Sequence, residues 1–305
     1  MLQPKVTPMI VRDSVYGEIE FQGAIAKIIN SQPLQRLKRI HQNGAMFLAY
    51  PHISTSRFEH SLGVCYLIRI LGGSIEEQIA GLLHDISHTA FSHVIDYVLD
   101  NRDEDFHEHH KLHFLSDRQI VKTLHSLKLQ PENFIDDRQF SLLETELPKL
   151  CADRLDYALR DLIAWNKISQ PEAQLFLDSL KVVNGTIAIN SIEQAYWFKN
   201  NYQYLNRHFF GDAKNIMANS AFSKLLQAAL KAEVLQIEDF FQDDNFVIDK
   251  INEDRTFKER LQAIGIGLKN LKEGEDENTI SQFKPREVDP PVIEAGNVIP
   301  LSAFV

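Results

Sequence analysis

Histidines crowd one part of this 305-residue chain. Eight of its twelve histidines lie within the 54 residues from His60 to His113, and the adjacent pair His84-Asp85 closes an otherwise apolar segment. Imidazole and carboxylate are both ligands for divalent transition metals, and helix neighbours about 100° apart can reach one ion. The pair therefore indicates a metal site. Taken alone, it equally fits a second interpretation, in which Asp85 caps the helix that follows.

Two further candidate ligands, His60 and Asp153, lie in separate segments of the sequence. When these two are added to the pair, the metal interpretation is favoured. His88 follows His84 by four residues, which is one helical turn if the helix continues. Four other histidines lie among charged or polar residues and are expected at the surface: His109, His110, His113 and His125.

Three separated blocks carry a resemblance to a known family. They are residues 56–64 (SRFEHSLGV), 81–93 (GLLHDISHTAFSH) and 153–161 (DRLDYALRD). Their order of His, His-Asp and Asp resembles the signature of the HD-domain metal-dependent phosphohydrolases. More narrowly, the blocks look like the branch that contains the deoxynucleoside triphosphate triphosphohydrolases, and residues 33–40 and 50–51 are similar to that branch too. The resemblance is strong over about the first 165 residues and looser beyond them.

This resemblance implies a role for each matching residue. It implies one divalent ion (iron, manganese, zinc or magnesium) held by four side chains: His60, His84, Asp85 and Asp153. Catalytic positions near the scissile phosphate are implied for His88 and His107, together with Asp85. The substrate contacts that it implies are Gln42 for base or sugar, Arg57 and Arg154 for phosphate, His93 beside the substrate, and Tyr157 and Asp161 for the sugar 3′-hydroxyl.

Elementary chemistry agrees with this division of roles. Hydrolysis of a phosphoester needs neutralised phosphoryl charge, a water of lowered pKa and a proton donor for the leaving oxygen. A metal and two arginines can neutralise the phosphoryl charge, and the same metal can lower the pKa of the water. A histidine that titrates near neutrality can donate the proton. Asp153, Tyr157 and Asp161 are spaced i, i+4 and i+8, so one helix face would present all three. Asp156 lies about 100° from Tyr157 around that helix and is assigned no catalytic role.

One departure from the branch concerns the helix expected at residues 195–214. Tyr202 stands where the branch carries an arginine for the phosphates, and residues 210–212 stand at its Tyr-x-His motif. Arg207 or Lys214 could substitute for the missing cation.

A second departure lies next to Gln42. Asn43 replaces a leucine that packs against deoxyribose in the branch. The amide of asparagine could bond a 2′-hydroxyl, so both ribose and deoxyribose stay open as the sugar.

Apolar spacing predicts that mostly helices position these residues. Residues 24–40 are interrupted by Pro33, which predicts two short helices or one kinked helix. Other helices are expected at residues 60–71, 75–83, 91–99, 140–147, 151–165, 170–180, 192–230 (with breaks) and 257–268. Strand signals occur at residues 15–21, at 182–189 around an Asn184-Gly185 turn, and at 292–301. With the resemblance, the predicted fold class is all-α, an HD-domain helical fold with small peripheral β-strands or a hairpin.

The chain shows no long linker. We expect residues 1–165 to form the HD phosphohydrolase core and residues 166–305 a helical C-terminal extension packed on it, as one continuous structural domain. Residues 269–286 are charged and poor in apolar side chains, which predicts an exposed loop.

The composition limits the classes of partner that this protein is expected to bind. The 42 acidic and 32 basic residues give a net charge of -10, which argues against a dedicated binder of long nucleic acids. A small phosphate ligand needs only a locally positive pocket. Two cysteines, Cys65 and Cys151, without metal spacing, and no apolar run of about 18 residues, predict a cytoplasmic protein with no membrane partner.

The leading hypothesis is therefore a metal-dependent phosphohydrolase that converts a deoxynucleoside triphosphate to deoxynucleoside and triphosphate. One alternative is a phosphodiesterase or phosphatase acting on a signalling nucleotide or a nucleoside monophosphate. A second alternative is a non-catalytic nucleotide-binding module. Because relatives in the family commonly assemble, a homo-oligomer, either a dimer or larger, is also expected.

Overall fold

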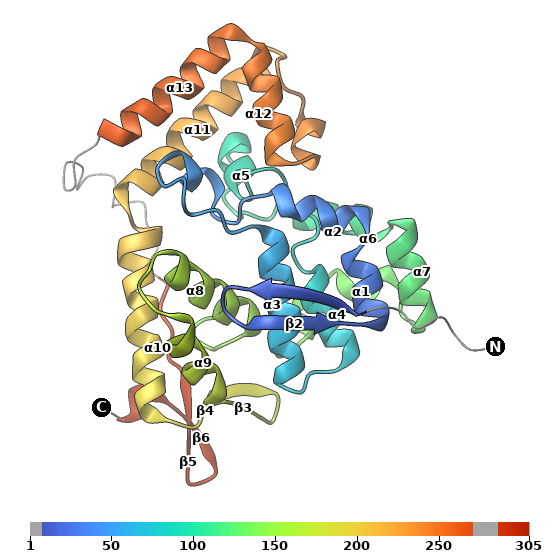
Figure 1. The fold of residues 1–305 in the computed structure, drawn as a ribbon, viewed down its shortest axis with the longest axis vertical. Helices are drawn as coiled ribbons and strands as arrows, with labels where there is room; N and C mark the ends of the chain where they lie inside the picture. The colour runs from blue at the N-terminus through green and yellow to red at the C-terminus, as the bar shows by residue number, and fades with distance from the viewer. Residues whose placement is uncertain (1–7, 271–285, 305) are drawn as a thin grey trace.

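Helices make up most of residues 8–270 and 286–304, the part of the chain that the computed structural model describes. At the centre, α3 (Arg57–Ile70) packs against both α4 (Ile75–Leu83) and α8 (Ala152–Ala164) (Figure 1). The other helices are α1 (Gly23–Ile29), α2 (Gln32–Arg36), α5 (Val94–Leu99), α6 (Lys111–Leu115), α7 (Arg118–Ser126), α9 (Gln170–Asp178), α10 (Ile192–Leu205), α11 (Ala213–Lys231), α12 (Asp244–Glu253) and α13 (Arg255–Asn270). This arrangement confirms the predicted all-α class.

The start of α3 is held by a reciprocal pair of hydrogen bonds. The Ser56 hydroxyl accepts from the Glu59 backbone nitrogen at 3.2 Å, and the Glu59 carboxylate accepts from the Ser56 backbone nitrogen at 2.9 Å. Such a capping box satisfies two backbone donors that a helix start leaves free. The first turn of α3 is therefore well defined, and it carries His60 into the interior.

Helices α3 and α8 approach closely at Gly63. A Cβ atom there would lie 1.9 Å from Asp156 Oδ1 and 2.3 Å from Arg160 Nη2. Arg160 donates to Asp156 at 2.9 and 3.0 Å and to Asp13 at 2.9 Å, while the Tyr16 hydroxyl donates to Asp156 at 2.8 Å. All of these polar groups are buried, and each charge has a partner. The close approach of α3 and α8 thus buries an ion-pair network between these helices.

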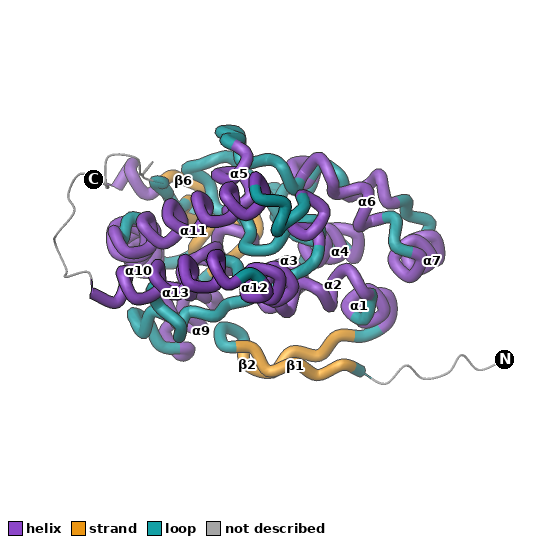
Figure 2. The backbone as a smooth tube through the Cα atoms, turned by 90° about the horizontal axis from the view of Figure 1, so that it is seen from above, coloured by secondary structure: helices purple, strands orange, loops and turns teal. Residues whose placement is uncertain are grey.

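The strands form two small sheets at the edges of the helices (Figure 2). One is an antiparallel hairpin, and the other has the order β3-β4-β5-β6, with β4 and β5 parallel. The strands are β1 (Met9–Asp13), β2 (Gly17–Phe21), β3 (Leu180–Val183), β4 (Thr186–Ile189), β5 (Pro291–Glu294) and β6 (Asn297–Pro300). Asn184 and Gly185 have φ angles of 50° and 74°, as the predicted tight turn requires. The C-terminal strands β5 and β6 therefore extend a sheet that begins with β3 and β4 from the middle of the sequence.

Buried apolar side chains form two clusters. The larger surrounds α3, α4 and α8, and the smaller joins α5 to α11, α12 and α13, which lie at the top of Figure 1. Helix α11 packs on both α5 and α13. The chain therefore has a central core and a helical flank built on a second set of contacts.

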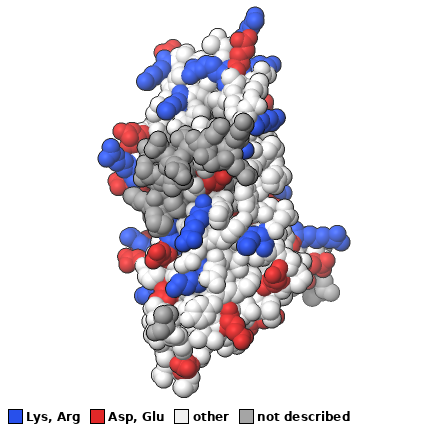
Figure 3. Space-filling model, turned by 90° about the vertical axis from the view of Figure 1, so that its left-hand side faces the viewer, with Lys and Arg blue, Asp and Glu red and all other residues white. Residues whose placement is uncertain are grey.

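The surface carries both signs of charge. On the face shown in Figure 3, basic and acidic side chains are interspersed over the described residues rather than gathered by sign. That face offers no continuous basic track of the kind that long nucleic acids follow. None of the described helices is both long and apolar enough to cross a membrane.

The structure overturns one predicted helix. Residues 140–147 form turns, because the carbonyl oxygens of Leu142 and Leu143 accept from the backbone nitrogens of Ala152 and Asp153 at 2.7 and 3.3 Å. These bonds lead into α8 instead of continuing a helix. Strand β1 and helices α6, α7 and α12 were not expected.

The interrupted helix at residues 24–40 is confirmed as α1, α2 and a short 3-10 turn (Leu37–Arg39). The predicted loop at 269–286 falls mainly on residues 271–285, which lie outside the described residues, and residues 269–270 end α13. The division of the chain near residue 165 stays a prediction.

Replacing Arg160 with alanine should lower the free energy of unfolding by about 3–5 kcal/mol, because Asp156 and Asp13 would be left buried without their cation. Urea denaturation measures this difference. Arg138→Ala is the matched control, because it removes an arginine from an exposed pair with Asp136 and should leave stability near that of the wild type. Equal losses in the two variants would contradict a stabilising role for the buried network.

Candidate active site

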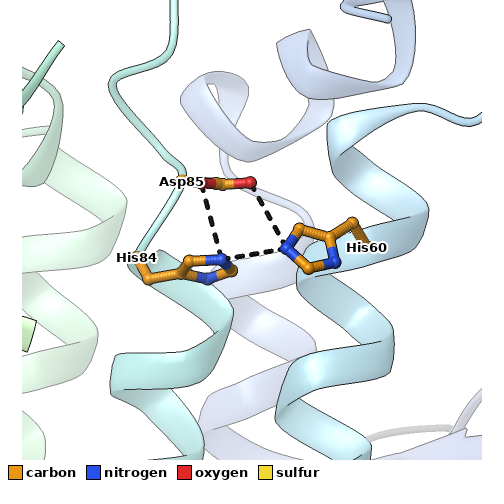
Figure 4. A group of neighbouring side chains, drawn as sticks. All are labelled: His60, His84 and Asp85. Carbon is orange, nitrogen blue, oxygen red and sulfur yellow. Dashed lines mark hydrogen bonds and ion pairs between the residues drawn. The ribbon is translucent and has the colours of Figure 1, made fainter. Parts of the chain in front are cut away.

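Four side chains from three helices meet at one point. His60 comes from the first turn of α3, His84 and Asp85 from the end of α4, and Asp153 from the first turn of α8. Figure 4 shows His60, His84 and Asp85 pointing toward one another. The Nε2 atoms of His60 and His84 are 3.2 Å apart, and Asp153 Oδ1 lies 2.9 and 3.6 Å from them. The structure thus brings together all four residues predicted to be metal ligands.

Both imidazoles donate from Nδ1, so each would turn its facing Nε2 to a metal once that nitrogen is deprotonated. His84 Nδ1 donates to the Gly81 carbonyl at 2.8 Å, and His60 Nδ1 donates to Asp156 at 2.7 Å. With the protons on Nδ1, both Nε2 lone pairs point into the cluster. Metal-bound histidines are usually oriented in this way by a carbonyl or carboxylate. Each of the two Nε2 atoms lies within 4 Å of an oxygen of Asp85 and of an oxygen of Asp153, a donor set that suits one transition metal.

The cluster is balanced by strong charge interactions. Asp85 faces Arg57 Nη1 at 2.6 Å and His88 Nε2 at 3.2 Å. Burial lowers the pKa of His60, but the hydrogen bonds that it donates to Asp153 and Asp156 outweigh burial and raise that pKa to about 10, so a metal would displace the proton on Nε2. Burial raises the pKa of Asp153, but the two imidazoles outweigh it and hold that pKa well below its usual range. The site therefore keeps its carboxylates ionised, as metal ligands must be.

Three more histidines stand beside the cluster. The rings of His88 and His107 stack with centroids 3.8 Å apart, and His93 meets both edge-on. Burial and Arg57 hold the pKa of His88 well below its usual value, while burial, His93 and Arg57 lower the pKa of His107 to about 3. Their buried Nδ1 atoms have no partner within the described residues. Both rings are neutral near pH 7 and have a nitrogen to offer to a substrate.

His93 differs from the other two histidines. Its side chain is 39% exposed, and its Nδ1 lies 3.3 Å from Asp96, whose side chain is buried. Burial raises the pKa of Asp96, but the neighbouring His93 outweighs it and lowers that pKa. His93 therefore combines partial exposure in the cleft with a buried carboxylate partner.

The cluster opens into a cleft of about 1290 Å³ whose walls include residues of α3, α5, α8 and α11. Tyr157 and Asp161 line it from α8, one and two turns beyond Asp153. Burial raises the pKa of Asp161 to about 7, against the hydrogen bond that Asn43 donates to it at 2.9 Å. Gln42 lies beside them, and its buried Oε1 is unpaired within the described chain. The cleft therefore carries hydroxyl, carboxyl and amide groups along one wall.

One predicted contact is not brought to the cleft. Arg154 Nη1 donates to the Lys149 carbonyl at 2.6 Å, and Nη2 donates to the Thr145 carbonyl at 3.1 Å. These bonds turn the guanidinium toward the loop before α8, so Arg154 holds that loop. Arg57 does line the cleft, with Nη1 bound to Asp85.

The departures noted in the sequence lie on the same wall. The Tyr202 hydroxyl is 2.7 Å from that of Tyr157, and Phe210 lines the cleft from the π-helical turn Asn206–Phe210. Arg207 and Lys214, the suggested replacement cations, are not among the residues that line the cleft.

Sequence reasoning missed three residues of this site. Asp156 had been set aside because it lies off the face of Tyr157, yet its carboxylate orients His60. Its spacing of four residues from the buried Arg160 was an available signal. Lys111 lines the cleft and pairs with Asp137 at 2.5 Å, and Arg286 reaches the cleft from the C-terminal segment. No local pattern links these two to the histidine blocks.

Comparison with known proteins agrees with the site. A family model described as HD domain matches residues 57–157. The chain is 39% identical over 287 residues to the uncharacterized protein YdhJ of Bacillus subtilis, covering 93% of this chain and 88% of that protein. It is 37% identical over 175 residues to the metal-dependent phosphohydrolase cns2 of Cordyceps militaris, covering 57% and 50%. It is also 37% identical over 105 residues to the human deoxynucleoside triphosphate triphosphohydrolase SAMHD1, covering 30% and 17%.

These findings, with the fold and the ligand cluster, define the class of the protein. The chain belongs to the HD-domain phosphohydrolase superfamily and is an HD-type metal-dependent phosphohydrolase. It spans half the length of cns2 and about a sixth of the length of human SAMHD1. The substrate is therefore a separate question.

Asp156→Asn should weaken metal binding about 10- to 100-fold, because the amide is a poorer acceptor for the proton on His60 Nδ1. Competition against a chromophoric chelator measures the affinity. Tyr16→Phe is the matched control, because it removes another hydrogen bond to the same carboxylate and leaves the bond to His60 in place. Equal affinities in the two variants would exclude Asp156 as the group that orients His60.

Acid should destabilise the metal-free protein through His107. Its pKa is about 3 in the folded state and about 6.5 when unfolded, so the unfolded chain binds more protons between these values. Stability is therefore lost as the pH falls below about 6.5, and by pH 5 the loss from this residue is about 2 kcal/mol. His107→Gln should remove that part of the loss, measured by urea denaturation at pH 7 and pH 5. His125→Gln, a change at an exposed histidine, serves as the control. If His107→Gln lost as much stability between pH 7 and pH 5 as His125→Gln, His107 would not be the source of the acid sensitivity.

Proposed function

We propose that this protein hydrolyses a deoxynucleoside triphosphate to the deoxynucleoside and inorganic triphosphate. The observation that carries the proposal is the arrangement along α8. Asp153 lies in the ligand cluster, while Tyr157 and Asp161 follow on the same side of the helix, about 6 and 12 Å along it. A nucleotide whose scissile phosphate is at the cluster would have its sugar hydroxyls near these groups. The likeness to the triphosphohydrolase SAMHD1 over 105 residues supports the same substrate class.

The four ligands His60, His84, Asp85 and Asp153 would hold one divalent ion, either iron, manganese, zinc or magnesium. Such an ion supplies phosphoryl charge neutralisation and a bound water of lowered pKa. His88 and His107 line the cleft beside the cluster as neutral imidazoles, and we assign them contacts to the phosphoryl oxygens. We assign the proton for the leaving oxygen to His93, which is partly exposed and paired with Asp96.

A second candidate function has specific support. Tyr202, at the position where a phosphate-binding cation was expected, is buried and bonded to Tyr157. Phe210 puts an uncharged side chain on the cleft wall, and Asn43 adds an amide beside Asp161. These features would suit a phosphatase or phosphodiesterase acting on a nucleoside monophosphate or a signalling nucleotide. The third reading, a non-catalytic nucleotide-binding module, is disfavoured by the complete set of buried ligands. We also propose a cytoplasmic homo-oligomer, as expected for relatives of this kind.

A panel of nucleotides tests these functions on protein whose metal content has first been measured. We expect the wild type to release inorganic triphosphate and deoxynucleoside from a deoxynucleoside triphosphate. The double variant His84→Ala/Asp85→Ala should lose both the metal and the activity, because half of the ligand set is removed. His93→Gln should keep the metal and lower kcat about 10²- to 10⁴-fold. His113→Gln, an exposed histidine outside the cleft lining, is the matched control.

Product analysis distinguishes the alternatives. Orthophosphate as the only inorganic product would replace the leading proposal with a phosphatase. Tight nucleotide binding without turnover across several metals would favour the binding module. Activity that persists in the double variant would overturn the assignment of the cluster, and full activity in His93→Gln would overturn the proton role of His93.

A further inference from the structure

Arg286 reaches the cleft from a part of the chain remote from the histidine blocks. It lies just before the C-terminal strands and lines the cleft, where its side chain is exposed. Its backbone is held on both sides by one buried residue. Asn206 Nδ2 donates to the Arg286 carbonyl at 2.7 Å, and the Arg286 nitrogen donates to Asn206 Oδ1 at 3.2 Å. Arg286 is thus held at its main chain, and its side chain lines the cleft.

Asn206 is itself in an unusual element. It begins the π-helical turn Asn206–Phe210 between α10 and α11, and its amide also donates to the Tyr202 carbonyl at 3.1 Å. Turns of this kind are rare and frequent at functional sites. The turn therefore presents an amide that clamps Arg286 against the end of α10.

The surroundings of Arg286 are polar, and the carboxylate of Glu104, which also lines the cleft, attracts it electrostatically. Its guanidinium interacts with the hydroxyl of Tyr157, which is in turn bonded to that of Tyr202. Among the described residues, no carboxylate lies within ion-pair distance of it. Arg57 and Arg138, which also line the cleft, pair with Asp85 and Asp136 at 2.6 and 2.8 Å. Arg286 therefore differs from these two arginines in having no ion-pair partner within 4 Å among the described residues.

A polyphosphate substrate needs such a charge away from the ligand cluster. Arg57 is already neutralised by Asp85, and Arg154 is turned away from the cleft. Tyr157 lies one helical turn, about 6 Å, from Asp153. A nucleoside triphosphate whose sugar lies at Tyr157 can fold its polyphosphate back toward its own 3′-hydroxyl, and the guanidinium beside Tyr157 would then contact the phosphates next to the one at the cluster. The planar fork of arginine matches a phosphate group better than it matches a neutral hydroxyl or base.

We propose that Arg286 binds the phosphate groups of the substrate that are not at the ligand cluster, and so selects nucleoside triphosphates over monophosphates. The inference rests on the proposed function and extends it to a residue outside the matched HD segment. It assigns Asn206 the role of a positioning residue. It also explains how the cleft can bind a triphosphate although Tyr202 and Phe210 are uncharged.

The test compares Arg286→Ala, Arg286→Lys and Arg207→Ala, the last being a matched control on the π-helical turn outside the cleft lining. Isothermal titration with inorganic triphosphate should show binding weakened about 10- to 100-fold in Arg286→Ala and partly restored in Arg286→Lys. With nucleotides, Arg286→Ala should raise KM for the triphosphate by a similar factor and change KM for the monophosphate little. Arg207→Ala should match the wild type, and thermal melts should agree among all three variants.

The two proposals fail separately. Wild-type affinity for inorganic triphosphate in Arg286→Ala would overturn the role of Arg286 whatever the enzyme hydrolyses. Equal rises in KM for tri- and monophosphate would also overturn it, since the residue would then not discriminate by phosphate number. If the wild type turns over no nucleotide while Arg286→Ala still loses inorganic triphosphate binding, the proposed function fails and the phosphate role of Arg286 stands.

Discussion

The close approach of α3 and α8 at Gly63 is the constraint on which the rest of the site depends. Any side chain at Gly63 would collide with Asp156 and Arg160, so the two helices could not stay at this separation. At this separation, His60 on α3 reaches Asp153 and Asp156 on α8. The ligand cluster is thus a product of helix packing. A shift of one helix by a fraction of a turn would separate the imidazole from both carboxylates.

Charge is the second constraint, because the cluster gathers ionised groups in a buried place. Each of two carboxylates forms an ion pair with an arginine: Asp85 with Arg57, and Asp156 with Arg160. Buried charges are tolerated only when they are paired in this way. The two arginines therefore hold the anionic groups apart and keep them ionised. Because Arg57 and Arg160 are themselves neutralised by these ion pairs, other cations must bind the phosphates of the substrate.

Much of the fold and the core of the site could be predicted from the sequence. Some of the site follows from local patterns, namely the adjacent pair His84-Asp85 and the spacing of Asp153 and Tyr157 on α8. Residues four apart on a helix lie on the same face, so such spacing predicts that their side chains point the same way. Short apolar repeats likewise predicted most helices. The helix expected at residues 140–147 was wrong because its backbone groups bond to the start of α8, a tertiary effect that periodicity does not record.

The parts that could not be predicted depend on contacts between distant segments. Arg154 matched a family position, but the loop carbonyls before α8 take its donors. Asp156 was judged by its angle on one helix, whereas its role is set by the neighbouring helix. Arg286 comes into the cleft only because Asn206, 80 residues earlier, binds its backbone. Side-chain direction at such places follows from packing, which a linear pattern does not contain.

The spread of the site along the chain has a consequence for its biosynthesis. The four residues of the ligand cluster are all made by residue 153, whereas the cleft wall from α11 follows later and Arg286 comes 133 residues after Asp153. At translation rates of about 5–20 residues per second, that interval is roughly 7 to 27 seconds. The nascent chain therefore carries its metal ligands well before it can enclose a nucleotide. The order of synthesis thus separates the residues of the ligand cluster from the last residues of the cleft.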